Sequence, residues 1–274
     1  MLAVVGFRWL YYDWKMYNEN YVLMHNEQER NMGHRYDRDL LETKIVNALK
    51  ENVKGLYRED FLNYTSNIQG TKDRCTEFVA QYLLNQGSEF NAGSWTIQRT
   101  RGYTTASHDG EHDWSGSNQE EKKIAYEMRN RSQKEKHHFA HIGEILDYEV
   151  PLSKVDGDNS GEIDLLSWNK EKNELILLEL KKPDSTETLL RCVLEVYTYW
   201  KVVWHERLAK DFGRPDASVR AAVLVFASSQ KKKSQPYEDW KSTEQPHIRE
   251  LMKGLDVGLY VLESETDLNV TKER

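Results

Sequence analysis

Two short apolar segments separated by a polar spacer constrain the fold of this chain more than any other feature. The first segment covers residues 162–168 and the second covers residues 174–181. The spacer between them, residues 169–173, is polar and has asparagine at both ends, as is typical of a hairpin loop. We therefore expect two adjacent antiparallel strands here.

Three charged residues stand out in these segments: Asp164 in the first, and Glu179 and Lys181 in the second. Successive side chains of a strand point to opposite faces, so Glu179 and Lys181 are expected to point the same way. Pairing of the two strands would bring Asp164 beside them. Unpaired charges in apolar surroundings are costly. A divalent ion would offset that cost, because carboxylate oxygens suit Mg²⁺ or Mn²⁺.

Asp164 and the triplet Glu179-Leu180-Lys181 resemble the signature of the PD-(D/E)XK nuclease superfamily, over residues 117–262. One departure is that Ile163, and not proline, precedes Asp164, although many members of the family also lack that proline. The resemblance implies an α/β fold, a restriction-endonuclease-like α/β sandwich around a central mixed sheet, with the core order helix, three strands, helix, strand. It also implies that Asp164, Glu179 and the backbone carbonyl of Leu180 bind Mg²⁺ or Mn²⁺, and that Lys181 orients the attacking water or stabilises the transition state.

A helix with a further acid is expected before these strands. Residues 117–120 match a capping box that has Ser117 as the N-cap. Glu121 shares a helical face with apolar residues three, four and seven positions further on, which would carry it toward the sheet. The resemblance implies a catalytic role for Glu121 in assisting the metal or the water. An ordinary solvated glutamate is the alternative, and Glu127 is the second choice for this role.

A second helix is expected from Leu189 to Ala209, where apolar residues recur with helical spacing, with its N-cap at residue 185 or 186. Glu195 and Tyr199 are four apart and lie on one stripe of it. RecB-like members of the superfamily place a glutamine and a tyrosine at this spacing. The resemblance therefore implies supporting roles for Glu195 and Tyr199, with Lys182 beside the catalytic lysine as a third supporting residue. A surface pair is the alternative.

The rest of the chain is expected to complete the sheet and to add a separate N-terminal region. Strands are predicted at 219–226 and 257–262, with a polar loop at 228–238 and a helix at 245–253. The predicted organisation is a mainly helical, aromatic-rich region of unassigned role (1–103), a linker (104–116) and a nuclease-like domain (117–274). Within the first region, helices are expected at 38–53 and 71–85.

Two other metal sites compete for the same sequence. Residues 156–164 match the first nine positions of an EF-hand calcium loop, but the twelfth position is Ser167 instead of glutamate. The flanking segments also read as strands, whereas an EF-hand needs helices. A zinc site is the second alternative, formed from His108, Glu111, His112 and Asp113 together with His137, His138 and His141. No cysteine joins them, and solvated histidines are favoured.

Composition bounds the remaining possibilities. The two cysteines, Cys75 and Cys192, indicate a reducing compartment, and the cytoplasm is the expected location. No apolar run approaches the ~20 residues that span a bilayer, so no membrane partner is expected. The formal net charge of -7 argues mildly against nucleic acid, since phosphate contacts need local lysine and arginine, and against tight binding of long duplex DNA without a partner.

Together these features predict a Mg²⁺-dependent nuclease that hydrolyses phosphodiester bonds of DNA or RNA, with a homodimer or a protein partner left open. A non-catalytic binding or regulatory module with the nuclease fold is the main alternative. A calcium-loop protein that uses residues 156–164 is the other. Binding of nucleic acid without cleavage in any metal would select the binding module.

Overall fold

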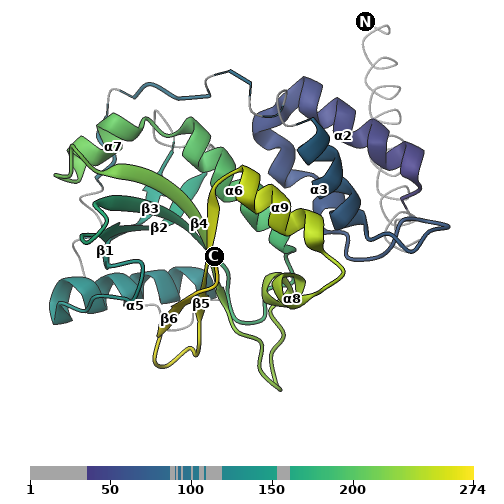
Figure 1. The fold of residues 1–274 in the computed structure, drawn as a ribbon. Coiled ribbons are helices and arrows are strands. Elements are labelled where there is room, and N and C mark those ends of the chain that lie inside the picture. The colour runs from purple at the N-terminus through teal and green to yellow at the C-terminus, as the bar shows by residue number, and fades with distance from the viewer. Residues whose placement is uncertain are drawn as a thin grey trace, which may run out of the picture.

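The computed structural model describes residues 36–86, 90, 92–93, 95–99, 101–104, 108, 119–152 and 161–274. The first 35 residues of the predicted aromatic-rich region, most of the predicted linker and positions 156–160 of the calcium-loop match lie outside the described residues. The protein is an α/β protein with a six-strand mixed sheet flanked by helices (Figure 1). The α/β class predicted from the sequence is therefore confirmed.

The sheet keeps its strands in chain order. The strands are β1 (Glu144–Pro151), β2 (Glu162–Asn169), β3 (Glu174–Leu180), β4 (Ser218–Phe226), β5 (Val257–Leu262) and β6 (Val270–Lys272). β1, β2 and β3 are antiparallel neighbours, β3, β4 and β5 run parallel, and β6 is antiparallel to β5. The two parallel connections pass through helices, as parallel pairs require.

The predicted hairpin is confirmed as β2 and β3. Leu165 pairs with Leu178, and Asn169 pairs with Glu174 at the turn. The side chain of Asn169 accepts a hydrogen bond from the amide of Lys172 at 3.2 Å. Asn173 adopts a φ of 53°, which asparagine tolerates better than most residues. Asn169 and Asn173, at the two ends of the spacer, therefore help to form the turn.

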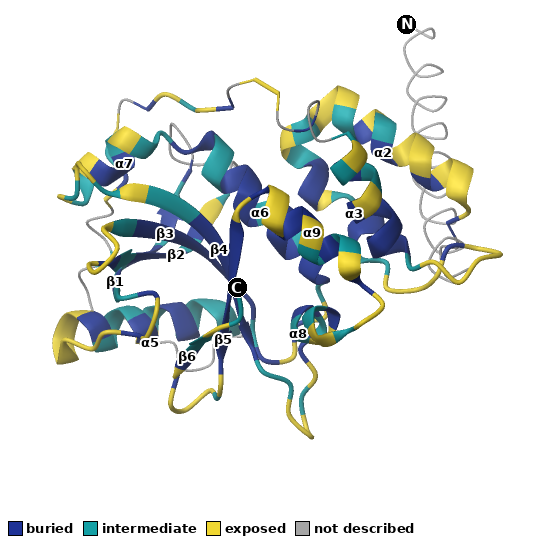
Figure 2. Cartoon of the chain, viewed as in Figure 1, coloured by how far each residue is buried: buried dark blue, intermediate teal, exposed yellow. Residues whose placement is uncertain are grey.

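Helices cover both faces of the sheet. α5 (Glu120–Glu135) packs its apolar stripe against one face, and α6 (Leu189–Val202) lies against the other (Figure 1). The described residues after α6 also form α7 (His205–Asp211), α8 (Gln235–Lys241) and α9 (Pro246–Gly254). The central strands are buried almost throughout (Figure 2). Because helices cover both faces of the sheet, both sides of a central strand such as β3 are apolar, and its sequence is a nearly continuous apolar run.

The described N-terminal helices pack onto the same core as α6. They are α2 (Arg38–Asn52), the 3₁₀ helices η1 (Val53–Arg58) and η2 (Asp60–Asn63), and α3 (Cys75–Asn85). Their buried residues, such as Leu41 and Phe61, belong to one apolar cluster with residues of α6 and α9. The boundary placed at residues 104–116 stays a prediction.

Several element boundaries differ from those expected. The helix predicted over 189–209 is two helices, because Val203 and Trp204 take extended backbone conformations between α6 and α7. α5 begins at Glu120 with Gln119 as N-cap and without a side-chain cap hydrogen bond, so the predicted capping box is wrong. Four elements were not predicted: the 3₁₀ helices η1 and η2, the helix α8, which starts within the predicted loop at 228–238, and the strand β6, which pairs with β5 near the end of the chain.

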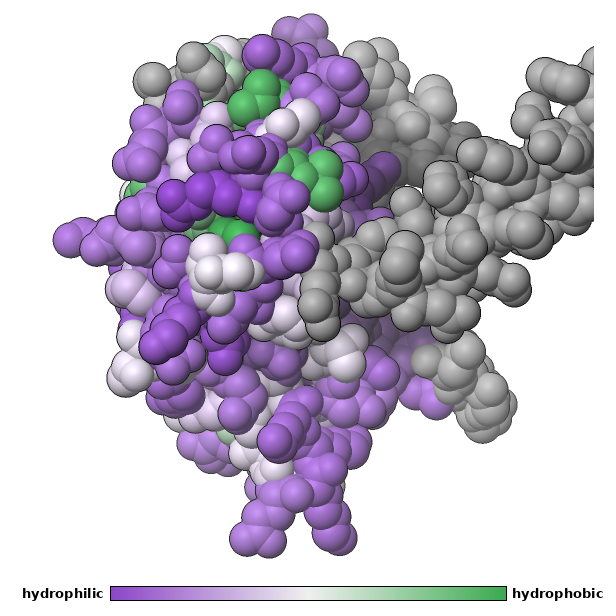
Figure 3. All heavy atoms as spheres, turned by 90° about the vertical axis from the view of Figure 1, so that its right-hand side faces the viewer, coloured by the Kyte–Doolittle hydropathy of each residue, from purple (hydrophilic) through white to green (hydrophobic). Residues whose placement is uncertain are grey.

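The described surface of the protein is mostly polar, as expected when the apolar residues are buried in the core. Figure 3 shows the side on the right of Figure 1, where hydrophilic residues dominate the coloured area and hydrophobic ones form small, separate spots. Among the described residues, the large hydrophobic side chain that stays exposed is Leu40. In the part of the chain that the structure describes, no helix combines the length and the apolar character needed to cross a membrane.

Candidate active site

Asp164 and Glu179 meet where the ladder between β2 and β3 ends. The last backbone pair is Leu165 with Leu178, and the two acids are the next residues of their strands. The amide of Leu180 donates a hydrogen bond to Oδ2 of Asp164 at 2.7 Å. Glu179 is 3% exposed, whereas Asp164 is only partly buried. The predicted pair is therefore brought together at one end of the strands.

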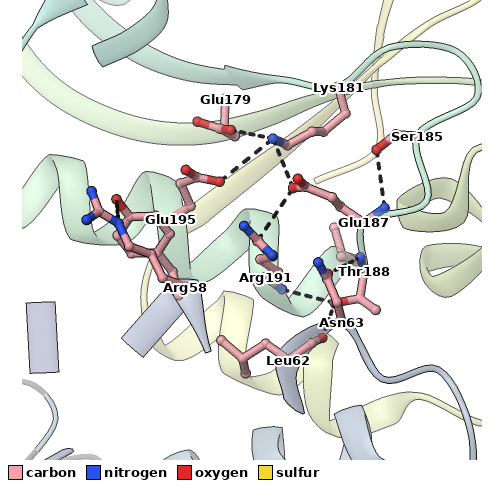
Figure 4. A network of polar contacts seen from close by, with 12 residues as sticks. Arg58, Leu62, Asn63, Glu179, Lys181, Ser185, Glu187, Thr188, Arg191 and Glu195 are labelled. Carbon is pink, nitrogen blue, oxygen red and sulfur yellow. Dashed lines mark hydrogen bonds and ion pairs between the residues drawn. The ribbon is translucent and has the colours of Figure 1, made fainter. Parts of the chain in front are cut away.

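Lys181 lies among three carboxylates. Its Nζ is 2.7 Å from Oε1 of Glu179, 3.0 Å from Oε2 of Glu187 and 3.7 Å from Oε2 of Glu195 (Figure 4). Lys181 is only 5% exposed, so water screens these contacts weakly. Because three acids hold the ammonium, its position is well defined relative to Glu179.

Glu121 reaches the same region from α5. Its Oε1 accepts a hydrogen bond from the backbone amide of Lys182 at 3.0 Å. The apolar residues on the same helical face, Ile124, Ala125 and Met128, are buried against the sheet, as expected. Lys182 joins through its backbone, while its ammonium lies 3.1 Å from Asp184 in an exposed position.

Glu195 and Tyr199 of α6 complete the arrangement. The hydroxyl of Tyr199 donates to Oε1 of Glu195 at 2.9 Å, while the other carboxylate oxygen faces Lys181. The predicted i,i+4 pair is therefore directed into the site. Gly161 sits against Tyr199: a Cβ at this glycine would lie 2.9 Å from the hydroxyl oxygen, and its φ of 94° suits glycine alone.

The start of α6 is anchored by the N-terminal region. Thr188 is the N-cap, so the expected cap at residue 185 or 186 is wrong. The amide of Thr188 donates to Oδ1 of Asn63 at 3.1 Å, and its hydroxyl donates to the carbonyl of Leu62. Asn63 ends η2 and comes from a distant part of the chain, so this cap could not be read from local sequence.

The environment raises the pKa of both hairpin acids. Burial raises the pKa of Asp164 from 3.8 to about 7, and the nearby charges of Glu121 and Glu195 add to this, while Lys181 and the amide of Leu180 oppose it. Burial, followed by the charge of Asp164, raises the pKa of Glu179 well above its ordinary value. Both acids are thus held in a setting that disfavours their charged forms.

The pKa values of Lys181, Cys192 and Tyr199 are raised too. Burial would lower the pKa of Lys181, but Glu179 and the other acids around it raise the pKa above its usual range. Burial raises the pKa of the Cys192 thiol and also that of the Tyr199 phenol, where the charges of Glu179 and Glu195 contribute. Lys181 is therefore cationic, whereas Cys192 and Tyr199 are neutral.

Within the described residues, the site has an excess of acids. Five carboxylates surround the ammonium of Lys181 or its immediate neighbours: Glu121, Asp164, Glu179, Glu187 and Glu195. No three His, Cys, Asp or Glu side chains in the described ranges form a closed metal cluster. The resemblance implies only two carboxylate ligands for the metal. This number suits Mg²⁺, which keeps several waters and takes one or two carboxylates from the protein. Asp164 and Glu179 fit that requirement in donor chemistry.

Sequence reasoning did not identify Glu187 or Arg58. Glu187 lies eight residues before Glu195, a spacing that would have put both on one side of a helix extended by one turn. Arg58, at the end of η1, lies beside Glu195 (Figure 4). No local signal connects Arg58 with β3, because the contact depends on how η1 packs against α6.

The competing metal sites have less support. Strands β1 and β2 flank positions 156–161, where an EF-hand needs helices. His137 and His141 do not share a helix, because α5 ends at Glu135, and both are exposed. His108 packs against Asp147, with its Nδ1 2.9 Å from the carboxylate. Its predicted neighbours Glu111, His112 and Asp113 lie outside the described residues.

Comparison with known proteins adds no relative: no protein-family model, no curated protein and no solved structure matches this chain. The geometry and chemistry of the residues described above are therefore what bears on the function of this protein.

Proposed function

We propose that this protein is a metal-dependent nuclease that hydrolyses phosphodiester bonds of DNA or RNA. One observation carries the proposal: Asp164, Glu179 and Lys181 meet where β2 and β3 stop pairing, in surroundings that raise the pKa of both acids. Carboxylates that are hard to charge in the free protein gain most from a bound cation.

The arrangement of the chain supports a restriction-endonuclease-like fold. A helix, three antiparallel strands, a helix and a parallel strand follow one another as α5, β1, β2, β3, α6 and β4. The paired acids lie on β2 and β3, the second and third strands of this order. This agrees with the core implied by the resemblance to the PD-(D/E)XK superfamily.

The proposed catalytic and metal-binding residues have separate roles. Asp164 and Glu179, with the carbonyl of Leu180, would hold Mg²⁺ or Mn²⁺, and the ion would lower the pKa of a bound water and stabilise charge on the phosphate. Lys181, positioned by its three carboxylates, would orient the water or neutralise the transition state. Glu121 would help to position the water or a second ion at the edge reached from α5.

Cleavage assays with matched variants test this proposal. Labelled single-stranded DNA, duplex DNA and RNA of one sequence are incubated with the purified protein and Mg²⁺, Mn²⁺ or EDTA. We expect cleavage that needs the metal and that falls at least ~1000-fold in Asp164→Asn and Glu179→Gln, because each removes a charged ligand. Asp184→Asn is the control, since that acid is exposed and paired with Lys182.

The outcomes separate the competing functions. Full cleavage by Asp164→Asn or Glu179→Gln would refute the site assignment. Binding of the oligonucleotides without cleavage in any metal would favour the non-catalytic binding module instead. Circular dichroism spectra of all variants are compared first, so that loss of activity is not confused with loss of fold.

A further inference from the structure

The N-terminal region borders the candidate site through the 3₁₀ helices η1 and η2. η2 caps α6 through Asn63 and Leu62, as described above. η1 packs against α6 through Tyr57, whose buried ring lies edge-on to Tyr199 with the ring centroids 5.7 Å apart. Because Tyr199 holds Glu195, η1 and η2 border the same acids that surround Lys181.

Arg58 of η1 is a cation close to these acids. It is exposed and forms the last residue of η1. Its Nε donates to the hydroxyl of Tyr57 at 2.8 Å, and its guanidinium lies 5.1 Å from the centroid of that ring. Figure 4 shows it beside Glu195. The Tyr57 contacts orient the guanidinium, and its exposed position keeps it within reach of a ligand in solution.

Because the site is acidic, a polyanionic substrate needs a cationic residue such as Arg58 beside it. A polyanionic substrate must approach five carboxylates, and the net charge of the chain is -7. Burial alone would lower the pKa of Arg58, but the hydrogen bond to Tyr57 and the proximity of Tyr199 and Glu195 raise it. The guanidinium therefore stays cationic next to the acids. Its planar set of N–H donors matches phosphate oxygens.

We propose that Arg58 binds a phosphate of the nucleic-acid backbone beside the cleaved bond, so that the N-terminal region is part of the substrate-binding surface. This inference rests on the proposed nuclease function for its substrate class. Arg58 is a binding residue in this scheme, and the proton transfers are left to the groups around Lys181.

Binding measurements in a non-cleaving background test the inference. The background is Asp164→Asn, and the probe is a labelled single-stranded DNA of about 30 nucleotides, followed by fluorescence anisotropy across a salt series. Adding Arg58→Gln is expected to weaken binding about tenfold at low salt and to lower the slope of log K against log salt by about 0.7, because one phosphate contact is lost. Glutamine can still hydrogen-bond to Tyr57, which preserves local packing.

Two further variants sharpen the result. Arg58→Lys keeps the charge, so the salt slope should be retained while affinity falls only a few-fold. Arg38→Ala is the matched control: Arg38 is also exposed, also stacks on an aromatic ring (5.0 Å from the Phe78 centroid) and also lies in the N-terminal region, where its guanidinium lies 3.6 Å from Asp73. Its removal should leave both affinity and slope unchanged.

The outcomes distinguish this inference from the proposed function. If the wild type cleaves and Arg58→Gln binds with unchanged affinity and slope, the role of Arg58 is overturned while the nuclease assignment stands. If binding depends on Arg58 but the wild type cuts nothing, the nuclease assignment falls and the binding surface stands. Absence of binding to single-stranded DNA, duplex DNA and RNA of the same sequence overturns both.

Discussion

Replacing Asp164 by asparagine should stabilise the metal-free protein at alkaline pH. Asparagine resembles the protonated acid: it keeps an oxygen that can accept the hydrogen bond from Leu180 but carries no charge. The wild-type carboxylate, by contrast, must ionise above its raised pKa, next to Glu121 and Glu195. A residue proposed to bind metal is therefore expected to destabilise the free protein.

The sign and the size of the expected change in the free energy of unfolding follow from the pKa of Asp164. Its folded value of about 7 lies above the ordinary 3.8, so the folded state binds more protons than the unfolded state between these values. Stability should therefore fall as pH rises through this window. Each pKa unit corresponds to about 1.4 kcal/mol, which gives a total cost on the order of 4 kcal/mol above about pH 7. The variant avoids this cost, so its gain at about pH 8 should be 2–4 kcal/mol, and it should vanish near pH 4.

Urea unfolding in EDTA, followed by circular dichroism, measures the effect at several pH values. Asp184→Asn is the control, because Lys182 lowers the pKa of that exposed acid, so no gain at alkaline pH is expected. Adding Mg²⁺ should stabilise the wild type but not Asp164→Asn. For a Kd of about 1 mM, about 10 mM Mg²⁺ would add roughly 1.4 kcal/mol.

Equal stability of wild type and Asp164→Asn at about pH 8 would refute the argument that burial and neighbouring acids destabilise this carboxylate. Equal stabilisation of both proteins by Mg²⁺ would show instead that the ion binds elsewhere. A gain that persists unchanged at acid pH would point to better packing by asparagine and away from the charge.

Three further predictions concern the support of the site. Lys181→Met should destabilise the protein by about 3–5 kcal/mol near neutral pH, because it leaves buried acids without their cation; a midpoint of urea unfolding equal to that of the wild type would contradict this. Gly161→Ala should cost about 1–3 kcal/mol and reduce metal-dependent cleavage by displacing Tyr199, and a variant with wild-type melting temperature and activity would argue against that packing constraint. Asp239→Ala should lower the melting temperature through a loss of about 2–3 kcal/mol, since Asp239 is buried and accepts the amide of Leu189 at 2.9 Å; an unchanged melting temperature would show that this contact adds no net stability.

The local part of the site was readable from the sequence. Strand periodicity placed Glu179 and Lys181 on one face, and the polar spacer predicted the turn that brings Asp164 alongside. Helical spacing likewise directed Glu121 toward the sheet. These predictions hold because the alternation of side chains and the formation of a short turn depend on neighbouring residues alone.

Other features depended on contacts between distant segments. Glu187 approaches Lys181 because Thr188 caps α6 with the help of η2, more than a hundred residues earlier in the chain. The predicted single helix over 189–209 is divided because Val203 and Trp204 leave the helical conformation, and the polar loop before α9 contains α8. Helical periodicity continues through such breaks, so it could not show them.

The sequence by itself determined the hairpin, the placement of its three charged residues and the alternation of helices with apolar strands. Only the tertiary structure decided how many acids gather around Lys181 and that the N-terminal region places Arg58 beside them. The physical reason is that side-chain alternation is a property of each strand, whereas burial, raised pKa values and ion pairs arise when separate elements pack and exclude water.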